Sequence, residues 1–386
     1  MHGITLTKAP ADWEILQQEN GKATVALKGN FQVHPAAIEV GVERVTPVVR
    51  VMSEDDNMTV IPWTNADHFT CNEKFQGEFE VTLEIPAGGP YRIDTSLETK
   101  STVPDLTWLY RGDCVLHLGV GNLFIIAGQS NSAGYSRDFC IDPPSMDVHL
   151  YRNRSKWDIA SHPMNESTFA GSLANEEMGV PGVSPYLAFG KTYGKMTGMP
   201  VGLIQTSLGG SPMERWNPKD GDLYLNMVDK IHETGGRYAG VLWYQGCSDT
   251  NPGPAEKYLE HFREYVEATR KELGYEIPFF TMQLNRQING INDECWGMVR
   301  DAQARAAKEI PGVSVLTTSN LSLCDGIHNT AQANVALGEK LAKQCAHVLN
   351  GKEEYQPPEL VKVERADEAE RKSFRKMALM ELILTM

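Results

Sequence analysis

The chain has 386 residues, of which 41% are hydrophobic and 22% are charged, so it is long enough for two or three domains with a sizeable core. The formal net charge of −14 argues against nucleic acid and against an anionic membrane surface as partners, because both require a basic face. Seven cysteines without paired spacing favour reduced thiols over a disulfide framework. No run of residues has the apolar length of a signal peptide or of a membrane span, so we expect a cytoplasmic location.

Residues 1–115 are predicted to form an N-terminal β-sandwich accessory domain. Short apolar runs recur at 23–27, 38–42, 47–51, 59–61, 79–85 and 91–93, and several of them alternate apolar with polar residues. Turn-forming residues at 29–30 and 87–90 separate some of these runs. The aromatic residues Trp63, Phe69 and Tyr91 are expected in the sandwich core, although exposed positions that bind carbohydrate are the alternative.

Residues 116–351 show a different pattern, in which apolar strands alternate with helices. The predicted strands are 123–127, 201–204, 240–244, 278–282 and 313–316, and the predicted helices are 185–197, 223–234, 255–273, 294–310 and 331–349. This alternation predicts an α/β domain with a parallel sheet covered on both faces. Residues 352–386 form a C-terminal tail, in which an apolar run at 360–363 suggests a strand that could return to the β-sandwich.

Ser130 follows the first predicted strand of this α/β domain, within Gly128-Gln129-Ser130-Asn131. The carboxyl end of a parallel strand is where such folds bind ligands. The alternative is a serine that caps a helix. The segment differs from the nucleophile elbow of α/β-hydrolases, because position 132 is serine where that motif has glycine.

Asp325 and His328 follow the last predicted strand, three residues apart. With this spacing the carboxylate can hold one ring nitrogen of the histidine and fix its tautomer. Taken alone, the pair fits a solvated loop with an unrelated histidine better than a catalytic pair. Together with Ser130, these residues are the parts of an activated nucleophile.

Two further strand ends carry groups that can donate hydrogen bonds to an oxyanion. Residues 205–210 end in the adjacent glycines Gly209 and Gly210, whose backbone N–H groups can approach a ligand closely. Residues 243–246 supply the side-chain amide of Gln245. Backbone N–H groups and side-chain amides are the usual donors of an oxyanion hole.

These four segments resemble the conserved blocks of the SGNH hydrolase superfamily, and within it the sialate O-acetylesterase and acetylxylan esterase-like branch. The blocks lie at 128–131, 208–212, 243–246 and 325–328, in the order of that family. The resemblance implies a flavodoxin-like three-layer α/β/α domain that works without metal or cofactor. It also implies Ser130 as nucleophile, His328 as base and Asp325 as the residue that orients it.

The same resemblance assigns the oxyanion hole to the N–H of Ser130, the N–H of Gly209 (or Gly210) and the amide of Gln245. There is one departure, because the branch commonly has glutamate after the third-block glycine and this chain has Cys247. Without a basic neighbour in the sequence, Cys247 is expected to be a packing residue.

The implied substrate is an acetylated mono- or oligosaccharide, either an O-acetylated sialic acid or an acetylated plant oligosaccharide. Six residues near the blocks are expected to contact it, although a solvated or packed loop position suits the three farthest from Ser130 equally well. They are Gln129, Asn131, Gly210, Arg215, Trp216 and Arg286. The alternatives are a lipid esterase or thioesterase, for which an apolar lid is missing from the sequence, and a non-catalytic carbohydrate-binding protein, which the complete set of triad residues disfavours.

Overall fold

The computed structural model of the protein describes residues 2–103, 109–168, 170–235, 237–288 and 290–351. The predicted tail at 352–386, with its strand at 360–363, lies outside these residues. No helix within the described ranges is long and apolar enough to cross a membrane.

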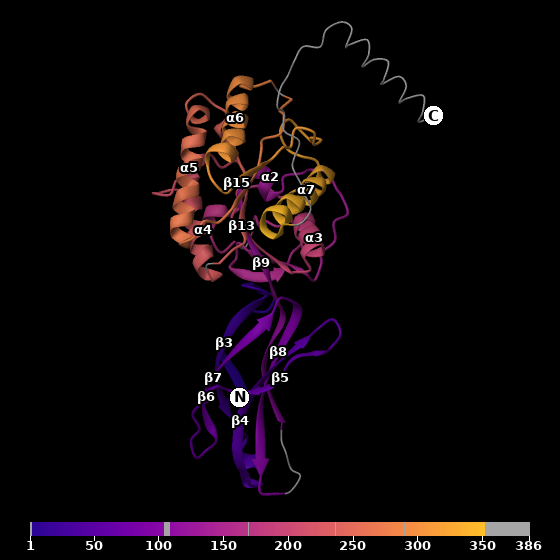
Figure 1. The fold of residues 1–386 in the computed structure, drawn as a ribbon, viewed down its shortest axis with the longest axis vertical. Coiled ribbons are helices and arrows are strands. Elements are labelled where there is room, and N and C mark those ends of the chain that lie inside the picture. Colours follow the sequence, from indigo (N-terminus) through magenta and orange to yellow (C-terminus); the bar gives the residue numbers. More distant parts are fainter. Residues whose placement is uncertain (1, 104–108, 169, 236, 289, 352–386) are drawn as a thin grey trace, which may run out of the picture. The chain divides into compact units, whose positions relative to one another are not determined.

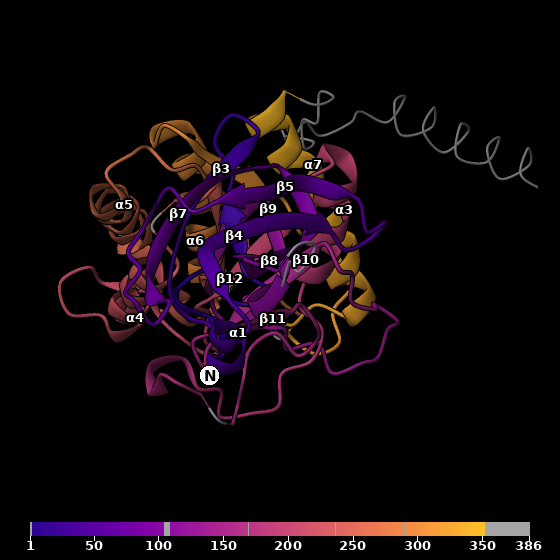
Figure 2. The same ribbon diagram turned by 90° about the horizontal axis from the view of Figure 1, so that it is seen from below.

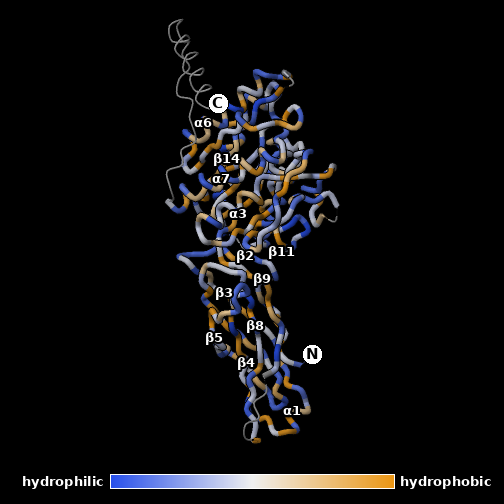
Figure 3. The backbone as a smooth tube through the Cα atoms, turned by 90° about the vertical axis from the view of Figure 1, so that its right-hand side faces the viewer, coloured by the Kyte–Doolittle hydropathy of each residue, from blue (hydrophilic) through white to orange (hydrophobic). Residues whose placement is uncertain are grey.

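The N-terminal region consists of two groups of strands, antiparallel except for the short β2, whose buried side chains share one hydrophobic cluster. Alternating burial along β3, in which every second side chain faces this cluster, accounts for the alternating sequence pattern, and Figure 3 shows hydrophobic and hydrophilic stretches following one another along these strands. The first group is β1 (Gly3–Lys8), β3 (Lys22–Gln32), β7 (Gln76–Pro86) and β6 (His68–Phe69). The second is β5 (Thr59–Asn65), β4 (Val42–Ser53), β8 (Gly88–Ser101) and the first half of β9 (Leu109–Gly128), with β2 (Ile15–Gln17) also paired to β9.

Three local predictions for this region are wrong. Gly29 lies within β3 and not in a turn, because its missing side chain makes room for Phe79 across the strand pair: a Cβ there would lie 2.6 Å from the Phe79 ring. The predicted strand at 38–42 covers instead the end of helix α1 (Pro35–Glu39), which Pro35 begins, a turn and the first residue of the next strand. Trp63 and Phe69 are 37% and 43% exposed and are not core residues, whereas Tyr91 is buried.

Strand β9 connects the N-terminal region to the rest of the chain. Its first half pairs with β8, from Leu109 to Val120, and its second half pairs with two strands of the central sheet. It therefore passes without a break through residue 115, where the sequence predicts a domain boundary.

The central sheet contains all five strands predicted from the sequence, running parallel to one another. They are β9, β12 (Val201–Gln205), β13 (Gly240–Tyr244), β14 (Phe279–Met282) and β15 (Val313–Leu316), and in space they lie in the order β12-β9-β13-β14-β15. This is a doubly wound order, in which the strands on the two sides of β9 are added in opposite directions. The sequence analysis missed β10 (Val148–Arg152), which extends the sheet in parallel beside β12, and β11 (Lys156–Ile159), which pairs antiparallel with β10.

Helices cover both faces of this sheet, so the region has three layers (Figures 1 and 2). One face packs against α4 (Asp222–Glu233), α5 (Pro254–Leu273) and α6 (Asp293–Glu309). The other face packs against α3 (Tyr186–Thr197) and α7 (Ala331–Asn350). The observed architecture is thus the mixed α/β fold with a central sheet that the sequence predicts, and the loops after β9, β12, β13 and β15 meet at its carboxyl edge.

Candidate active site

Ser130 stands where β9 ends, as the first residue of the short helix α2 (Ser130–Ala133). The sharp change of direction depends on Gly128, whose φ is +133° and whose Cα lies so close to Tyr244 that an added Cβ would be 2.3 Å from its carbonyl oxygen. The backbone N–H of Gln129 donates to the same carbonyl at 2.9 Å. The turn is therefore fixed by the neighbouring strand, and it holds Ser130 at the sheet edge with 5% of its surface exposed.

The structure brings the three predicted catalytic residues into contact. His328 Nε2 lies 2.9 Å from Ser130 Oγ, and His328 Nδ1 lies 2.7 Å from Asp325 Oδ2. Because an ionised carboxylate only accepts, the proton of the neutral ring is held on Nδ1 and the lone pair of Nε2 faces the serine hydroxyl. The arrangement is that of a nucleophile, a base and a residue that orients the base.

Asp325 is held in its charged form by its surroundings. Burial would raise the pKa of this carboxyl, but hydrogen bonds from the N–H groups of Ile327 and His328 and from the His328 ring outweigh it and lower the pKa below its usual range. Both backbone bonds go to Oδ1, at 2.9 and 2.8 Å, which leaves Oδ2 for the ring. Arg137 adds a distant cation, with Nε 3.9 Å from Oδ2 and its side chain 75% exposed.

Asn131, predicted to contact substrate, instead holds the histidine loop. Its Nδ2 donates to the carbonyl of Ile327 at 3.1 Å, and its Oδ1 accepts the N–H of Asn329 at 3.0 Å. The side chain is 2% exposed, so it has no free face for a ligand. Because its two partners flank His328, Asn131 fixes the position of the histidine relative to the neighbouring Ser130.

The loop after β12 is attached to the same strand end, since the N–H of Leu208 donates to the carbonyl of Gly128 at 3.0 Å. The N–H of Gly209, predicted for the oxyanion hole, is already engaged: it donates to Glu177 Oε1 at 2.9 Å. Gly210 follows with a φ of +69° and is exposed, and its N–H makes no hydrogen bond to another described residue. The structure therefore favours Gly210 over Gly209 as the second-block donor.

Glu177 is a buried residue of this site that the sequence analysis missed. It is 3% exposed and accepts hydrogen bonds from Gly209 N–H, from Tyr135 Oη and from Asn165 Nδ2. Burial raises the pKa of its carboxyl, which the three hydrogen bonds partly offset. The ring of Tyr135 in turn stacks on the His328 imidazole, with 5.7 Å between centroids. A lone glutamate in a segment without periodicity gives no sequence signal for this role.

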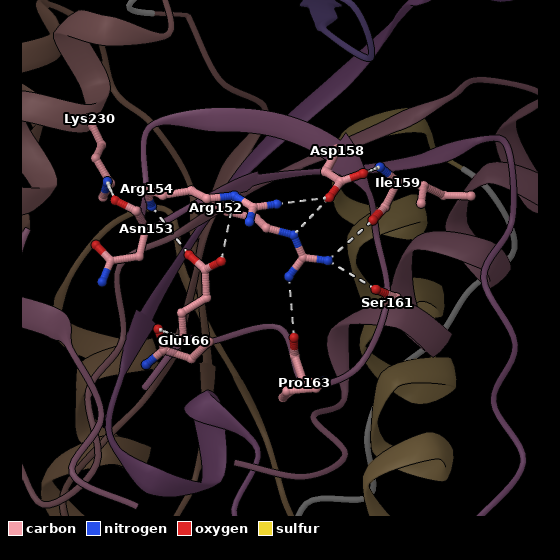
Figure 4. A network of polar contacts seen from close by, with 10 residues as sticks. Arg152, Asn153, Arg154, Asp158, Ile159, Ser161, Pro163, Glu166 and Lys230 are labelled. Atoms are coloured by element: carbon pink, nitrogen blue, oxygen red, sulfur yellow. Dashed lines mark hydrogen bonds and ion pairs between the residues drawn. The ribbon is translucent and has the colours of Figure 1, made fainter. Parts of the chain in front are cut away.

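A polar network holds the segment that carries Asn165 (Figure 4). Arg152 bonds to Asp158, to Ser161 and to the carbonyls of Ile159 and Pro163. The next residue but one, Arg154, bonds to Asp158 and donates its N–H to Glu166 Oε2 at 3.2 Å. Since the carbonyl of Glu166 accepts the N–H of Glu177 at 2.9 Å, this network also fixes the backbone of the buried glutamate.

Gln245, the predicted side-chain donor of the oxyanion hole, is turned away from that role. Its amide nitrogen donates to the carbonyl of Ser211 at 3.1 Å and to the Asp249 carboxylate, and the side chain is fully buried. Both amide hydrogens are thereby engaged in hydrogen bonds.

The side-chain amide of Gln129 keeps its donor available. Its oxygen accepts the N–H groups of Gly246 and Ser248, while its nitrogen makes no hydrogen bond to another described residue.

Three other residues predicted to contact substrate make contacts within the protein. Trp216 is fully buried in the core beneath the sheet and cannot stack on a sugar. Arg215 forms a bidentate ion pair with Asp222, with hydrogen bonds of 2.9 and 2.6 Å. Arg286 donates to the carbonyls of Ser319 and Leu321 and so connects two loops.

Burial raises the pKa of the Cys247 thiol to about 12, so it is protonated at neutral pH and is not a second nucleophile.

Comparisons with known proteins relate the chain to carbohydrate esterases. The family described as carbohydrate esterase, sialic acid-specific acetylesterase, matches residues 120–347, more than half of the chain. A probable carbohydrate esterase of Arabidopsis thaliana is 26% identical over 245 residues, which cover 57% of this chain and 88% of that protein.

Two solved structures share the fold. An Arabidopsis thaliana protein has a TM-score of 0.52 at 25% identity, over 59% of this chain and 99% of that one. A carbohydrate acetylesterase of Xanthomonas citri has a TM-score of 0.53 at 20% identity, over 90% of this chain and 76% of that one. The chain belongs to the sialic acid-specific acetylesterase family of carbohydrate esterases.

Proposed function

We propose that the protein is a carbohydrate O-acetylesterase that works through an acyl-enzyme on Ser130. The observation that carries the proposal is the continuous line from Asp325 Oδ2 to His328 Nδ1 at 2.7 Å and from His328 Nε2 to Ser130 Oγ at 2.9 Å. Both distances are hydrogen-bond distances, so the base can take the proton of the nucleophile at Nε2 while the carboxylate orients the ring at Nδ1. The family to which the chain belongs makes an acetyl ester the expected bond.

The chemistry follows from the tautomer. His328 Nε2 takes the hydroxyl proton as Ser130 Oγ attacks the acetyl carbonyl, and the ionised Asp325 stabilises the imidazolium that forms. The imidazolium then gives its proton to the sugar oxygen, which leaves as a hydroxyl group. A water molecule, deprotonated by His328, attacks the acetyl-Ser130 ester and releases acetate.

The negative charge on the tetrahedral intermediate needs donors that are not already engaged. Among the described residues near Ser130, the N–H of Ser130 and the N–H of Gly210 fulfil this condition, and both follow strand ends that are bonded to each other through Gly128. We therefore assign the oxyanion hole to these two groups. The free amide nitrogen of Gln129 is a third donor of suitable chemistry.

For the substrate we propose an acetylated mono- or oligosaccharide, either an O-acetylated sialic acid or an acetylated plant oligosaccharide. The printed descriptions of the family and of the two esterases above support a sugar ester. We further infer a flavodoxin-like catalytic domain and an N-terminal β-sandwich, on the strand order and the shared core described above.

One feature favours a second activity, towards apolar esters. Several large apolar side chains are exposed on the segments at 135–142 and 173–180, which carry Tyr135 and Glu177: Phe139 is 86% exposed, Ile141 84%, Met178 103% and Val180 87%. Such side chains could contact a longer acyl chain. A lipid or thioester substrate is thus the competing proposal, and it predicts faster cleavage of butyrate than of acetate.

The test compares wild type with Ser130→Ala in two assays: acetate release from O-acetylated sialic acids and from acetylated xylo- and manno-oligosaccharides, and p-nitrophenol release from p-nitrophenyl acetate and butyrate. We expect the wild type to cleave acetyl sugars and the variant to lose at least about 10³-fold in rate. A folded wild type that releases no acetate, or a variant that keeps full activity, would refute the assignment and favour a non-catalytic binding protein.

A further inference from the structure

The outer face of the second strand group in the N-terminal region carries a hollow of about 350 Å³, which lies at the lower end of the range for small-molecule sites. Arg50 of β4, Arg92 and Asp94 of β8 and Arg111 of β9 line it, together with Trp63 of β5. The strand register places these side chains next to one another, because Arg50 pairs with Asp94 across β4 and β8. Side chains alternate between the two faces of a strand, and the opposite face of these strands packs into the core. The side chains that line the hollow therefore point to the outer, solvent-facing side.

The charge of this hollow is opposite to that of the protein. Three guanidinium groups face one carboxylate, in a chain with a formal net charge of −14. Arg111 is exposed, and its guanidinium makes neither a hydrogen bond nor an ion pair with another described residue. A cluster of like charges costs free energy in the unliganded protein, and an anionic ligand would remove that cost.

Asp94 fixes two of the arginines without using them up. Its Oδ2 accepts Arg50 Nε and its Oδ1 accepts Arg92 Nε, each at 2.8 Å. A further bond, of 3.3 Å, joins Arg92 Nη2 to Asp94 Oδ2. The remaining N–H groups of both guanidiniums are unpaired among the described residues. Such oriented donors suit a carboxylate, which accepts two parallel hydrogen bonds from an arginine.

Trp63 adds a flat apolar surface to these donors. Trp63 is 37% exposed, and the Arg50 guanidinium lies 4.6 Å from its ring centroid. Large aromatic side chains in this position bury apolar area when a ring-shaped ligand packs against them. The hydroxyls of Thr95 and Ser96 are already bonded to backbone carbonyls, so recognition would depend on the arginines, on Asp94 and on the indole.

We propose that this hollow binds a sugar that carries a carboxylate, such as a sialic acid or a uronic acid. The carboxylate would pair with Arg111 and with the free N–H groups of Arg50 and Arg92, and the pyranose ring would pack against Trp63. Asp94, an acceptor, would take a sugar hydroxyl. The site is separate from Ser130, and it does not rest on the proposed esterase activity.

The experiment is a titration of the full-length protein, labelled with ¹⁵N at its tryptophans, at low ionic strength. The chain has seven tryptophans, and the indole signal that disappears in Trp63→Phe belongs to Trp63. N-acetylneuraminic acid and D-glucuronic acid represent the two sources of the carboxylated ring, D-glucose lacks the charge, and acetate lacks the ring. We expect the Trp63 signal to shift with at least one acidic sugar. The sugar with the lower dissociation constant shows whether the site prefers a sialic acid or a uronic acid.

The variants test the arginines. Arg111→Gln is expected to raise the dissociation constant at least about fivefold, whereas Arg44→Gln, an exposed arginine of β4 outside the hollow, should change it less than about twofold. Absence of a shift with both acidic sugars, equal binding of glucose or of acetate, or an unchanged affinity in Arg111→Gln would each overturn the proposal. Hydrolysis of p-nitrophenyl acetate should be the same in Arg111→Gln as in wild type, so failure here and failure of the esterase proposal are distinguishable.

Discussion

Replacing Asn131 by alanine should slow catalysis while leaving substrate binding nearly unchanged. The substitution removes two hydrogen bonds, at 3.1 Å to the carbonyl of Ile327 and at 3.0 Å from the N–H of Asn329. Each such bond contributes about 1 kcal/mol, and the buried N–H of Asn329 loses its partner, so the free energy of unfolding should fall by about 2–4 kcal/mol. Since His328 lies between these two contacts, its ring should lose its fixed position over Ser130.

The catalytic loss can be estimated from that displacement. A shift of about 1 Å between a base and its nucleophile typically costs about a hundredfold in rate. We therefore expect kcat to fall about 10²-fold and KM to change less than about threefold, because Asn131 faces the loop and not the substrate. Steady-state kinetics with p-nitrophenyl acetate and the best acetyl sugar, together with urea unfolding, measure both effects.

Two further variants make the reasoning refutable. Asn122→Ala, at the other end of the central part of β9, also removes the hydrogen bonds of a buried amide, but far from His328, and should lower stability without lowering kcat. Asn131→Asp keeps the acceptor for Asn329 but sets a carboxylate oxygen against the carbonyl of Ile327, so it should be as slow as Asn131→Ala. If Asn131→Ala raised KM with kcat intact, the residue would be a substrate contact after all.

Three other variants test the electrostatics. Asp325→Asn should favour the wrong tautomer of His328 and lower kcat/KM about 10³–10⁴-fold, whereas Arg137→Ala should stay within about twofold; pH–rate profiles of both decide. Glu177→Gln sets an amide N–H against the donor group of Tyr135 or Gly209 and should lower kcat about tenfold. An unchanged circular dichroism spectrum and an unchanged KM would show that this loss does not come from unfolding. Burial lowers the pKa of His149 from its ordinary 6.5 to about 4. Between these two pH values His149 binds a proton in the unfolded chain but not in the folded protein. The free energy of unfolding therefore falls as the pH drops through that range. The loss should reach about 2 kcal/mol between pH 7 and pH 5, and urea unfolding of His149→Gln should not show it.

The strands and helices around the site could be predicted because their signals are local. Five of the seven strands of the central sheet and the five helices that cover it were expected, since continuous apolar runs and helical periodicity depend on short stretches of sequence. The exceptions depended on distant partners. Gly29 resembles a turn residue until Phe79 is placed beside it, and β10, between β12 and the edge strand β11, has an apolar pattern interrupted by His149.

The candidate triad was predictable for the same reason, whereas the direction of the polar side chains around it was not. Ser130 follows the end of β9 and His328 lies in the loop after β15. The parallel sheet places both residues at its carboxyl edge, where they meet. Gln245 and Asn131, by contrast, each carry an amide with equal chemistry towards a ligand or towards the protein. Which way each one turns depends on Asp249 or on the carbonyl of Ile327, and no local pattern encodes those contacts.

The carboxylates around the second block give a physical meaning to the cysteine at position 247. Glu177 accepts the N–H of Gly209 at 2.9 Å, and Asp249 accepts the N–H of Met213 at 3.1 Å, so the loop from Gly209 to Met213 is held at both ends. Neither acceptor stands at position 247, and the Cys247 thiol carries no charge at neutral pH. Since the loop has its carboxylate supports elsewhere, an acid after the third-block glycine is not needed to hold Gly210, the residue that we propose as an oxyanion donor.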